Sequence, residues 1–159
     1  MKRDFLFSNF LERFPNDDIC LEEIKKVKFP TGVYCITCFK ITKHYRVKNR
    51  TAYSCAICRH QVYPLADTIF EKSTTSLRTW FYAMFLMTHT RAELSITQLQ
   101  KELGVTYKTA WRIYKQLYAL MQQNNSDLLT KPHENRLLQW TFFNKFEIKV
   151  VEKKEIIEK

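Results

Sequence analysis

Two pairs of cysteines are the residues of this sequence best suited to chemistry. Cys35 and Cys38 are separated by two residues, as are Cys55 and Cys58, and 16 residues lie between the pairs. Two intervening residues let a tight turn direct both sulfurs at one ion, and two such turns complete a tetrahedral thiolate shell. Because this shell leaves no open coordination position, we predict one structural Zn²⁺ and not a catalytic metal.

Other candidate ligands lie close to the cysteine pairs. His44 and His60 are rivals, but four thiols already complete the shell, so we expect surface or phosphate-contacting roles for both histidines. Cys20 makes the cysteine count five, which argues against a secreted disulfide framework. We expect Cys20 to be a small buried hydrophobic residue. The alternative of unrelated or disulfide-prone pairs fits the regular spacing less well.

The segments around the cysteines have the alternation of β-strands. Residues 40–54, "KITKHYRVKNRTAYS", alternate β-branched and aromatic residues with polar ones, and "KNRT" near the middle predicts a hairpin turn. Residues 60–70, "HQVYPLADTIF", predict a third strand. Residues 34–70 therefore have the pattern of a zinc ribbon.

After residue 70 the apolar spacing becomes helical. The segment 74–90, "TTSLRTWFYAMFLMTHT", has Ser76 as the expected N-cap and is apolar around most of its circumference, which predicts a core helix. Its candidate core residues are Leu77, Trp80, Phe81, Met84, Phe85 and Met87.

Two further helices are predicted in residues 94–121, "LSITQLQKELGVTYKTAWRIYKQLYALM". Thr97 is the expected cap of a short helix whose apolar face is Leu99 and Leu103. Gly104 provides a turn that accepts positive φ, and Thr106 is the expected cap of the second helix. A short helix, a glycine turn and a second helix are the helix-turn-helix arrangement.

The second of these helices has two different faces. Ala110, Ile113 and Leu117 recur at i, i+3 and i+7 and should face the core, with Val105 beneath the turn. No acid occurs from 103 to 126, so the other face would meet phosphates without repulsion. An ordinary helical hairpin with a solvated basic face is the alternative, and Trp111 would then lie at the core edge. The predicted DNA-contacting residues of this helix are Thr106, Tyr107, Lys108, Thr109, Trp111, Arg112 and Lys115.

Positive charge is concentrated around the cysteines. Lys and Arg total 26 against 16 Asp and Glu, giving a net charge of +10, so polyanions are the first partners to consider. Residues 24–66 hold nine bases and no acid, whereas residues 145–159 mix five bases with four acids. A local excess is expected of a binding face. The basic residues of the ribbon predicted to contact DNA are Lys43, Arg46, Lys48, Arg50 and Arg59, with Lys40 beside them.

Taken in order, these motifs resemble the N-terminal region of insertion-sequence transposases, in which a transposase zinc-ribbon domain precedes a helix-turn-helix. The resemblance covers about residues 11–121. It implies that the four cysteines bind zinc, that the helix opening at Thr106 reads the element's terminal repeats, and that "DTIFEKSTTSLRTWF" packs between ribbon and helices. The family usually has a glycine after the first cysteine pair, where this chain has Phe39 and Lys40. It also commonly has a glycine before Thr68, where this chain has Asp67.

In that family a ribonuclease-H-like nuclease with clustered acidic residues follows. The 32 residues after Asp127 contain no Asp, and such a fold needs roughly 100 residues with carboxylates to hold its metal ions. We therefore predict a chain without catalytic residues. The last segment, "RLLQWTFFNKFEIKVVEKKEIIEK", predicts one or two strands. Three roles are open for this segment: a remnant of the nuclease's first strand, a pairing surface for a second copy of the chain, or a cap on this domain. We favour packing or dimerisation. Its candidate buried residues are Trp140, Phe142, Phe146, Ile148 and Val150.

The sequence thus predicts a small α+β protein with a four-cysteine zinc ribbon, a helix-turn-helix domain and a short strand-rich C-terminal tail. The expected divisions are 1–33, an N-terminal helical segment; 34–70, the ribbon; 74–123, the helix-turn-helix; and 124–159, a linker and tail. No run of about 18 apolar residues and no signal peptide is evident, which favours a cytoplasmic, nucleoid-associated protein without membrane or small-molecule partners.

The predicted function is non-catalytic binding of duplex DNA, as a transcriptional regulator or as a transposition accessory or inhibitor. Two alternatives remain open. In the first alternative, the ribbon is a protein–protein interaction module of the transcription machinery. In the second, the chain is the DNA-binding subunit of a split transposase. If Arg112 reads a base, its replacement by alanine should relax sequence preference by about 1 to 3 kcal/mol.

Overall fold

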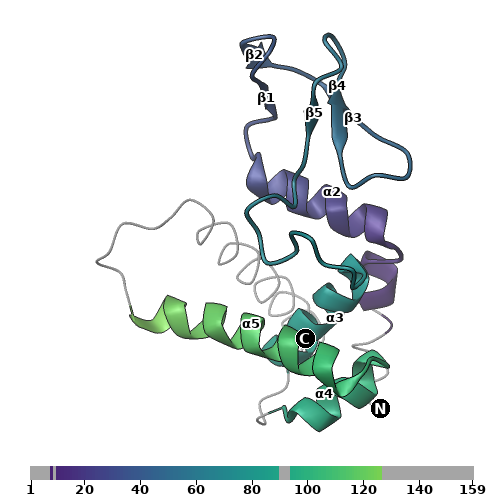
Figure 1. Cartoon of the computed structure of the whole chain (residues 1–159), viewed down its shortest axis with the longest axis vertical. Helices are drawn as coiled ribbons and strands as arrows, with labels where there is room; N and C mark the ends of the chain where they lie inside the picture. The colour runs from purple at the N-terminus through teal and green to yellow at the C-terminus, as the bar shows by residue number, and fades with distance from the viewer. Residues whose placement is uncertain (1–7, 9, 90–93, 127–159) are drawn as a thin grey trace, which may run out of the picture.

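The computed structural model describes residues 8, 10–89 and 94–126, and the predicted C-terminal tail with its dimerisation surface lies outside them. Strands gather at one end, helices α4 and α5 lie at the other, and α2 and α3 lie between them (Figure 1). The predicted small α+β architecture is confirmed. The helices are α2 (Asp17–Lys28), α3 (Leu77–His89), α4 (Ile96–Leu103) and α5 (Tyr107–Ser126). The strands are β1 (Tyr34–Cys35), β2 (Lys40–Ile41), β3 (His44–Arg46), β4 (Tyr53–Cys55) and β5 (Gln61–Val62).

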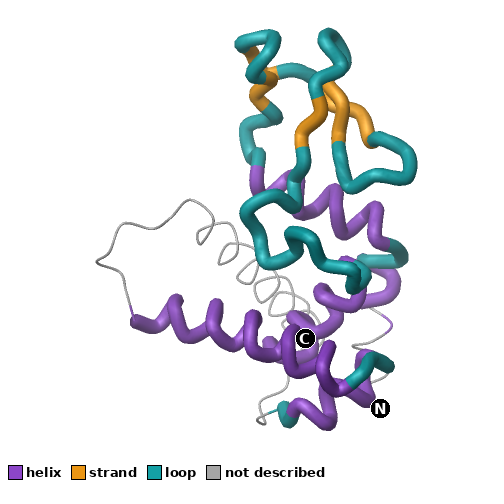
Figure 2. The backbone as a smooth tube through the Cα atoms, in the orientation of Figure 1, coloured by secondary structure: helices purple, strands orange, loops and turns teal. Residues whose placement is uncertain are grey.

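The ribbon consists of two small antiparallel sheets (Figure 2). Strands β3, β4 and β5 form the predicted hairpin and third strand, with His44 opposite Cys55 in the register. The turn between β3 and β4 is closed by a hydrogen bond from the amide of Val47 to the carbonyl of Ala52 at 2.9 Å. The hairpin β1–β2 was not predicted, because strands of two residues leave no alternation to recognise.

Helix α2 precedes the ribbon and has both of its ends specified by sequence. Asn16 caps it, accepting a hydrogen bond from the amide of Ile19 at 3.0 Å. Acids in the first turn and lysines in the last complement the helix dipole. Its buried residues are Cys20, Leu21 and Ile24, which confirms the expectation that Cys20 is buried.

Gly32 turns the chain from α2 into β1. Its φ is +106°, and a Cβ there would lie 2.8 Å from Cγ2 of Ile41. A side chain at this position would therefore be strained and would also collide with β2.

Helix α3 lies at the centre of the protein as predicted. Ser76 caps it, accepting from the amide of Thr79 at 3.1 Å. Leu77, Trp80, Phe81, Met84 and Phe85 are buried, and Met87 is partly buried against them. The segment between ribbon and helix packs on this core, since the ring of Phe70 meets that of Trp80 edge-on at 5.7 Å.

Helix α4 begins two residues earlier than the sequence suggested. Its cap is Ser95 and not Thr97, because the side chain of Ser95 accepts from the amide of Gln98 while the side chain of Gln98 accepts from the Ser95 amide. This reciprocal capping box satisfies two helix-end donors, which a cap at Thr97 would leave open. The prediction of Thr97 was wrong because the Ser-x-x-Gln pattern that begins two residues earlier was overlooked.

The turn between α4 and α5 follows the predicted chemistry. Gly104 is in the left-handed region with φ 62°, and its amide donates to the carbonyl of Gln100. Thr106 caps α5, accepting from the amide of Thr109 at 3.3 Å. Ala110, Ile113 and Leu117 are fully buried, and Leu99 of α4 is buried with them. The assignment of this helix pair as a DNA-binding helix-turn-helix remains a prediction.

One cluster of buried side chains joins the elements described. It includes Phe10, Phe14 and residues of α2 to α5, and Tyr53 of the ribbon belongs to it. The predicted domain boundaries stay a prediction, but the ribbon is attached to the helices by side chains of the same core.

Candidate metal centre and nucleic-acid interface

The four paired cysteines come together at one point of the ribbon. Their sulfur atoms all lie within 4.8 Å of one another. The sulfurs of Cys35 and Cys58 are 3.4 Å apart, and those of Cys38 and Cys55 are 3.9 Å apart. Two turns far apart in sequence therefore face each other, as the spacing predicted.

These distances fit zinc. A zinc–sulfur bond of about 2.3 Å in tetrahedral geometry places neighbouring sulfurs about 3.8 Å apart. The two sulfur–sulfur distances given above fall on either side of that value, and the remaining ones do not exceed 4.8 Å. The cluster therefore fits one structural Zn²⁺, and neither His44 nor His60 belongs to it.

Hydrogen bonds stabilise the thiolate form of Cys55. The hydroxyl of Thr42 lies 3.2 Å from the Cys55 sulfur, and the amide of Ile57 donates to it at 3.4 Å. Thr42, followed by backbone amides, lowers the pKa of Cys55 to about 5. The thiolate is the form that binds metal, so Thr42 supports the site from outside the cysteine pairs. The sequence pattern did not single out Thr42, because its role depends on the register of the hairpin.

The ribbon is fastened to α2 by polar contacts. Arg46 donates to the carboxylate of Asp18 from Nε at 3.1 Å and from Nη2 at 2.8 Å. The hydroxyl of Tyr53 donates to Glu22 at 2.7 Å, and the ammonium of Lys25 lies 4.1 Å from the Tyr53 ring centre. Arg46 was predicted to contact DNA, but its guanidinium is already paired within the protein.

The contact between Tyr53 and Glu22 changes the ionisation of both partners. Partial burial acts to raise the pKa of Glu22, but hydrogen bonds from Lys25 and Tyr53 outweigh it and lower the pKa. Burial, and then the neighbouring Glu22, raise the pKa of Tyr53. At neutral pH the carboxylate is therefore charged and the phenol is a donor.

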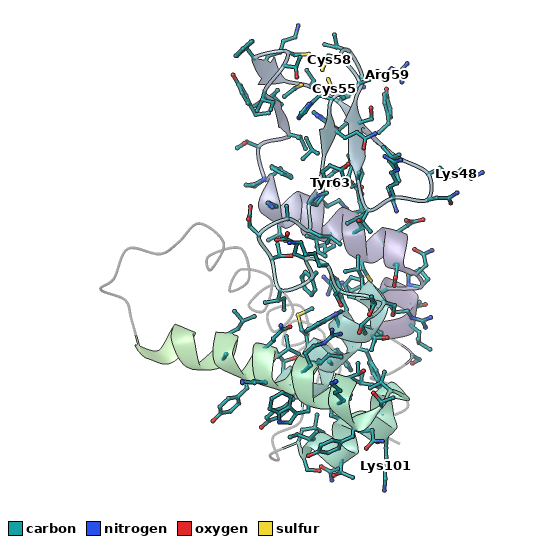
Figure 3. The ribbon with its side chains drawn as sticks, viewed as in Figure 1. Lys48, Cys55, Cys58, Arg59, Tyr63 and Lys101 are labelled. Atoms are coloured by element: carbon teal, nitrogen blue, oxygen red, sulfur yellow. The ribbon has the colours of Figure 1, made fainter. Side chains whose placement is uncertain are left out.

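The other predicted bases of the ribbon are exposed. Figure 3 places Lys48 on the loop between β3 and β4, pointing away from the sheet, and Arg59 beside the metal site. Lys43 and Arg50 are exposed too. With Lys48 and Arg59 they form the ribbon's basic surface, defined as Lys43, Lys48, Arg50 and Arg59.

Helix α5 exposes most of the predicted contact residues. Tyr107 is 53% and Trp111 is 45% exposed, so Trp111 is not a core residue. Lys108 and Lys115 are exposed, and the ammonium of Lys115 lies 5.0 Å from the Trp111 ring centre. We call Tyr107, Lys108, Trp111 and Lys115 the outer face of α5.

Arg112 differs from the rest of that set. Its Nη2 donates to the hydroxyl of Thr75 at 2.7 Å, and its Nε is buried. Arg112 therefore links α5 to the segment before α3 and does not point freely outward. Whether it also contacts a base remains a prediction.

The sequence analysis missed a group of exposed apolar side chains at the metal site. Ile36 and Phe39 belong to the first cysteine turn and Ile57 to the second, and each is at least 60% exposed. The available signal was their type, because large apolar residues are unusual in short polar turns.

Four thiols gathered by two turns, on short antiparallel strands, define a zinc-ribbon protein. Comparison with known families makes the class more specific, since residues 15–61 match the family described as the transposase zinc-ribbon domain. This region of the chain is therefore similar to a transposase zinc ribbon, which supports the resemblance found in the sequence.

A protein of a mobile element is also similar. The chain is 36% identical over 93 residues to an uncharacterized protein in the transposable element ISH50 of Halobacterium salinarum, a match that covers 56% of this chain. The same match covers 30% of the length of the ISH50 protein. Together the two matches support an insertion-sequence transposase N-terminal region. No solved structure matches the chain. Among the helices described, none has the length and apolar character to cross a membrane.

Proposed function

We propose that this chain binds duplex DNA, with α5 in the major groove and the ribbon's basic surface on the phosphate backbone, and that it does not itself cleave DNA. The biological role proposed is that of a transcriptional regulator or of an accessory or inhibitor of transposition.

The contrast between the two faces of α5 carries the proposal. Ala110, Ile113 and Leu117 are fully buried, which fixes the rotation of the helix and turns the outer face to solvent. That face offers two lysines and two aromatic rings, in a stretch from 103 to 126 that contains no acid. A helix held by a partner helix and a glycine turn, with a basic exposed face, suits insertion into a major groove.

The positions of the two basic surfaces support contact with an elongated partner. The ribbon lies at one end of the protein and α5 at the other (Figure 1). They would therefore meet different segments of one duplex, the helix reading bases and the ribbon adding phosphate contacts. A net charge of +10 favours such an encounter.

Selection of bound duplexes from a random pool tests DNA binding and sequence preference together. If about six phosphates are contacted, affinity for the selected site should fall roughly 10³-fold between about 50 and 200 mM salt. If no duplex is retained at low salt, the proposal fails. A selected site in terminal repeats would indicate a role in transposition, and one beside the gene would indicate autoregulation.

Matched lysine variants locate the contact. Lys108→Ala should weaken binding, whereas Lys72→Ala should not, although both remove one charge from an exposed side chain. Lys72 is in the loop before α3 with its ammonium 3.6 Å from Glu71, outside both proposed surfaces. Equal effects of the two variants would mean that net charge, and not α5, determines binding.

The non-catalytic part of the proposal has its own test. Supercoiled plasmid incubated with the purified chain and Mg²⁺ should stay supercoiled. Nicked or linear product that disappears with a metal chelator would overturn it.

A further inference from the structure

We propose that the tip of the ribbon, formed by Ile36, Phe39 and Ile57, is an apolar wedge that enters the minor groove of duplex DNA and kinks it. This inference rests on the proposed function and specifies how the ribbon engages the duplex. We call these three residues the knuckle tip.

The three side chains are exposed where the fold gives them little to pack against. Ile36 is 62%, Phe39 is 80% and Ile57 is 60% exposed. Each is directly adjacent to a cysteine in sequence, and the four sulfurs lie within 4.8 Å of one another. The metal site therefore presents apolar groups from both turns on a rigid support.

Phe39 also has an unfavourable backbone. It lies in the left-handed region with φ 52°, a conformation that glycine adopts freely and a bulky residue does not. Arg59 follows the second cysteine pair as Phe39 follows the first, and its φ of 66° is in the same region. Both positions expose a large side chain where glycine would fit without strain. Since an exposed side chain contributes little to folding, a role in binding explains Phe39 better than packing does.

The charges around the knuckle tip indicate what it contacts. Lys40, Lys43 and Arg59 are its charged neighbours in sequence, and no acid occurs from 24 to 66. Zinc bound to four thiolates carries a net charge of −2 (2 − 4), and the three bases exceed this by one, so the tip attracts a phosphate backbone more than a second copy of itself. Proteins that wedge open the minor groove insert apolar side chains such as Phe or Ile and contact the groove with basic ones.

A wedge has a mechanical consequence for the DNA. Insertion between two base pairs unstacks them and bends the duplex away from the protein, toward the major groove. Flexible steps such as TA should be preferred over stiff A-tracts, although no base edge is read at the step.

Energy transfer between the ends of a labelled duplex of about 30 base pairs with a central TA step measures this bend. The zinc-loaded full chain should shorten the end-to-end distance. Phe39→Gly should abolish the bend and weaken binding about tenfold, while zinc content stays at one per chain and thermal stability stays equal or rises. The slope of affinity against salt should not change, because no phosphate contact is lost.

Arg59→Gly is the matched control. It also places glycine at a left-handed position after a cysteine pair, but it removes a charge and no apolar group. It should reduce the salt slope by about one and leave the bend intact. The two variants thus separate the wedge from the phosphate contact.

Other results would overturn the wedge. If Phe39→Gly binds and bends the duplex as the unaltered chain does, the wedge is wrong while DNA binding stands. If the unaltered chain binds no duplex, the proposed function fails as well. If Phe39→Gly loses retention on phosphatidylserine vesicles and binds DNA normally, the tip is a membrane contact.

Discussion

The zinc ribbon and the helical body are stabilised by different interactions. Within residues 34–63 the buried apolar residues other than cysteine are Ala52 and Tyr53. The helical body buries large side chains such as Trp80, Phe81 and Leu99 in one cluster. The ribbon therefore depends on metal binding and the helical body on burial of apolar surface, and only the second can be stable without an ion.

The junction between the regions combines both kinds of interaction. Tyr53 places its ring in the common core and its hydroxyl on Glu22, and Arg46 pairs with Asp18. Since these contacts lie on α2, the ribbon is oriented by the helix before it. The comparison can therefore be tested separately in the ribbon, the body and the junction.

Removal of zinc should have the largest effect. Cys35→Ser should lose the metal and unfold the ribbon, because structural zinc contributes on the order of 10 kcal/mol to folding. Elemental analysis gives the metal content, and circular dichroism should still report the helices. Cys20→Ala is the matched control, since that cysteine is buried in the helical body and should leave one zinc per chain. Complete loss of the helical circular-dichroism signal after chelation of zinc would show that the helical body needs the ribbon in order to stay folded.

The reciprocal change is a cavity in the helical body. Phe81 is fully buried, with its ring edge-on to Phe14 at 4.9 Å. Phe81→Ala should cost about 3 to 5 kcal/mol of unfolding free energy in urea while zinc is retained. Phe39→Ala, at an exposed phenylalanine of the ribbon, should change stability far less. Zinc loss in Phe81→Ala would contradict separate stabilisation of the two regions.

The junction should contribute a smaller, pH-dependent amount. Tyr53→Phe should lose about 1 kcal/mol, because the partly exposed hydrogen bond to Glu22 is removed. The pKa of Glu22 is lowered in the folded protein, so its contribution is present above the unfolded carboxyl pKa and is lost as pH falls through the folded one. The difference in unfolding free energy between the unaltered chain and Tyr53→Phe should therefore decrease as the pH falls. Tyr45→Phe, at an exposed tyrosine of β3, should have no such effect.

Helix capping should give the smallest effect and distinguishes the two candidate caps of α4. Ser95→Ala should cost about 1 kcal/mol, since it removes one half of the capping box. Thr97→Ala should change stability by less than about 0.5 kcal/mol, because Thr97 lies within the first turn and is exposed. Thermal unfolding of both variants makes the comparison. A larger cost at Thr97 would mean that the helix begins there.

Local chemistry was predictable because its signals lie within a few residues. The cysteine spacing located the metal site, and the three-to-four-residue recurrence of Ala110, Ile113 and Leu117 identified the buried face of α5. Gly104 and Thr106 were assigned correctly because turn and cap preferences are properties of single residues. The hairpin β1–β2 was missed because two residues carry no periodicity.

The sequence by itself identified the four cysteines that cluster, the presence of the helices and the excess of positive charge. Only the tertiary structure decided which bases are available to a partner. Arg46 is paired with a carboxylate 28 residues away, and Arg112 with a hydroxyl 37 residues away. Lys43 and Lys48, which look the same in sequence, remain exposed. The reason is physical: side-chain type and local spacing fix charge and periodicity, but pairing between distant residues exists only once the chain has folded.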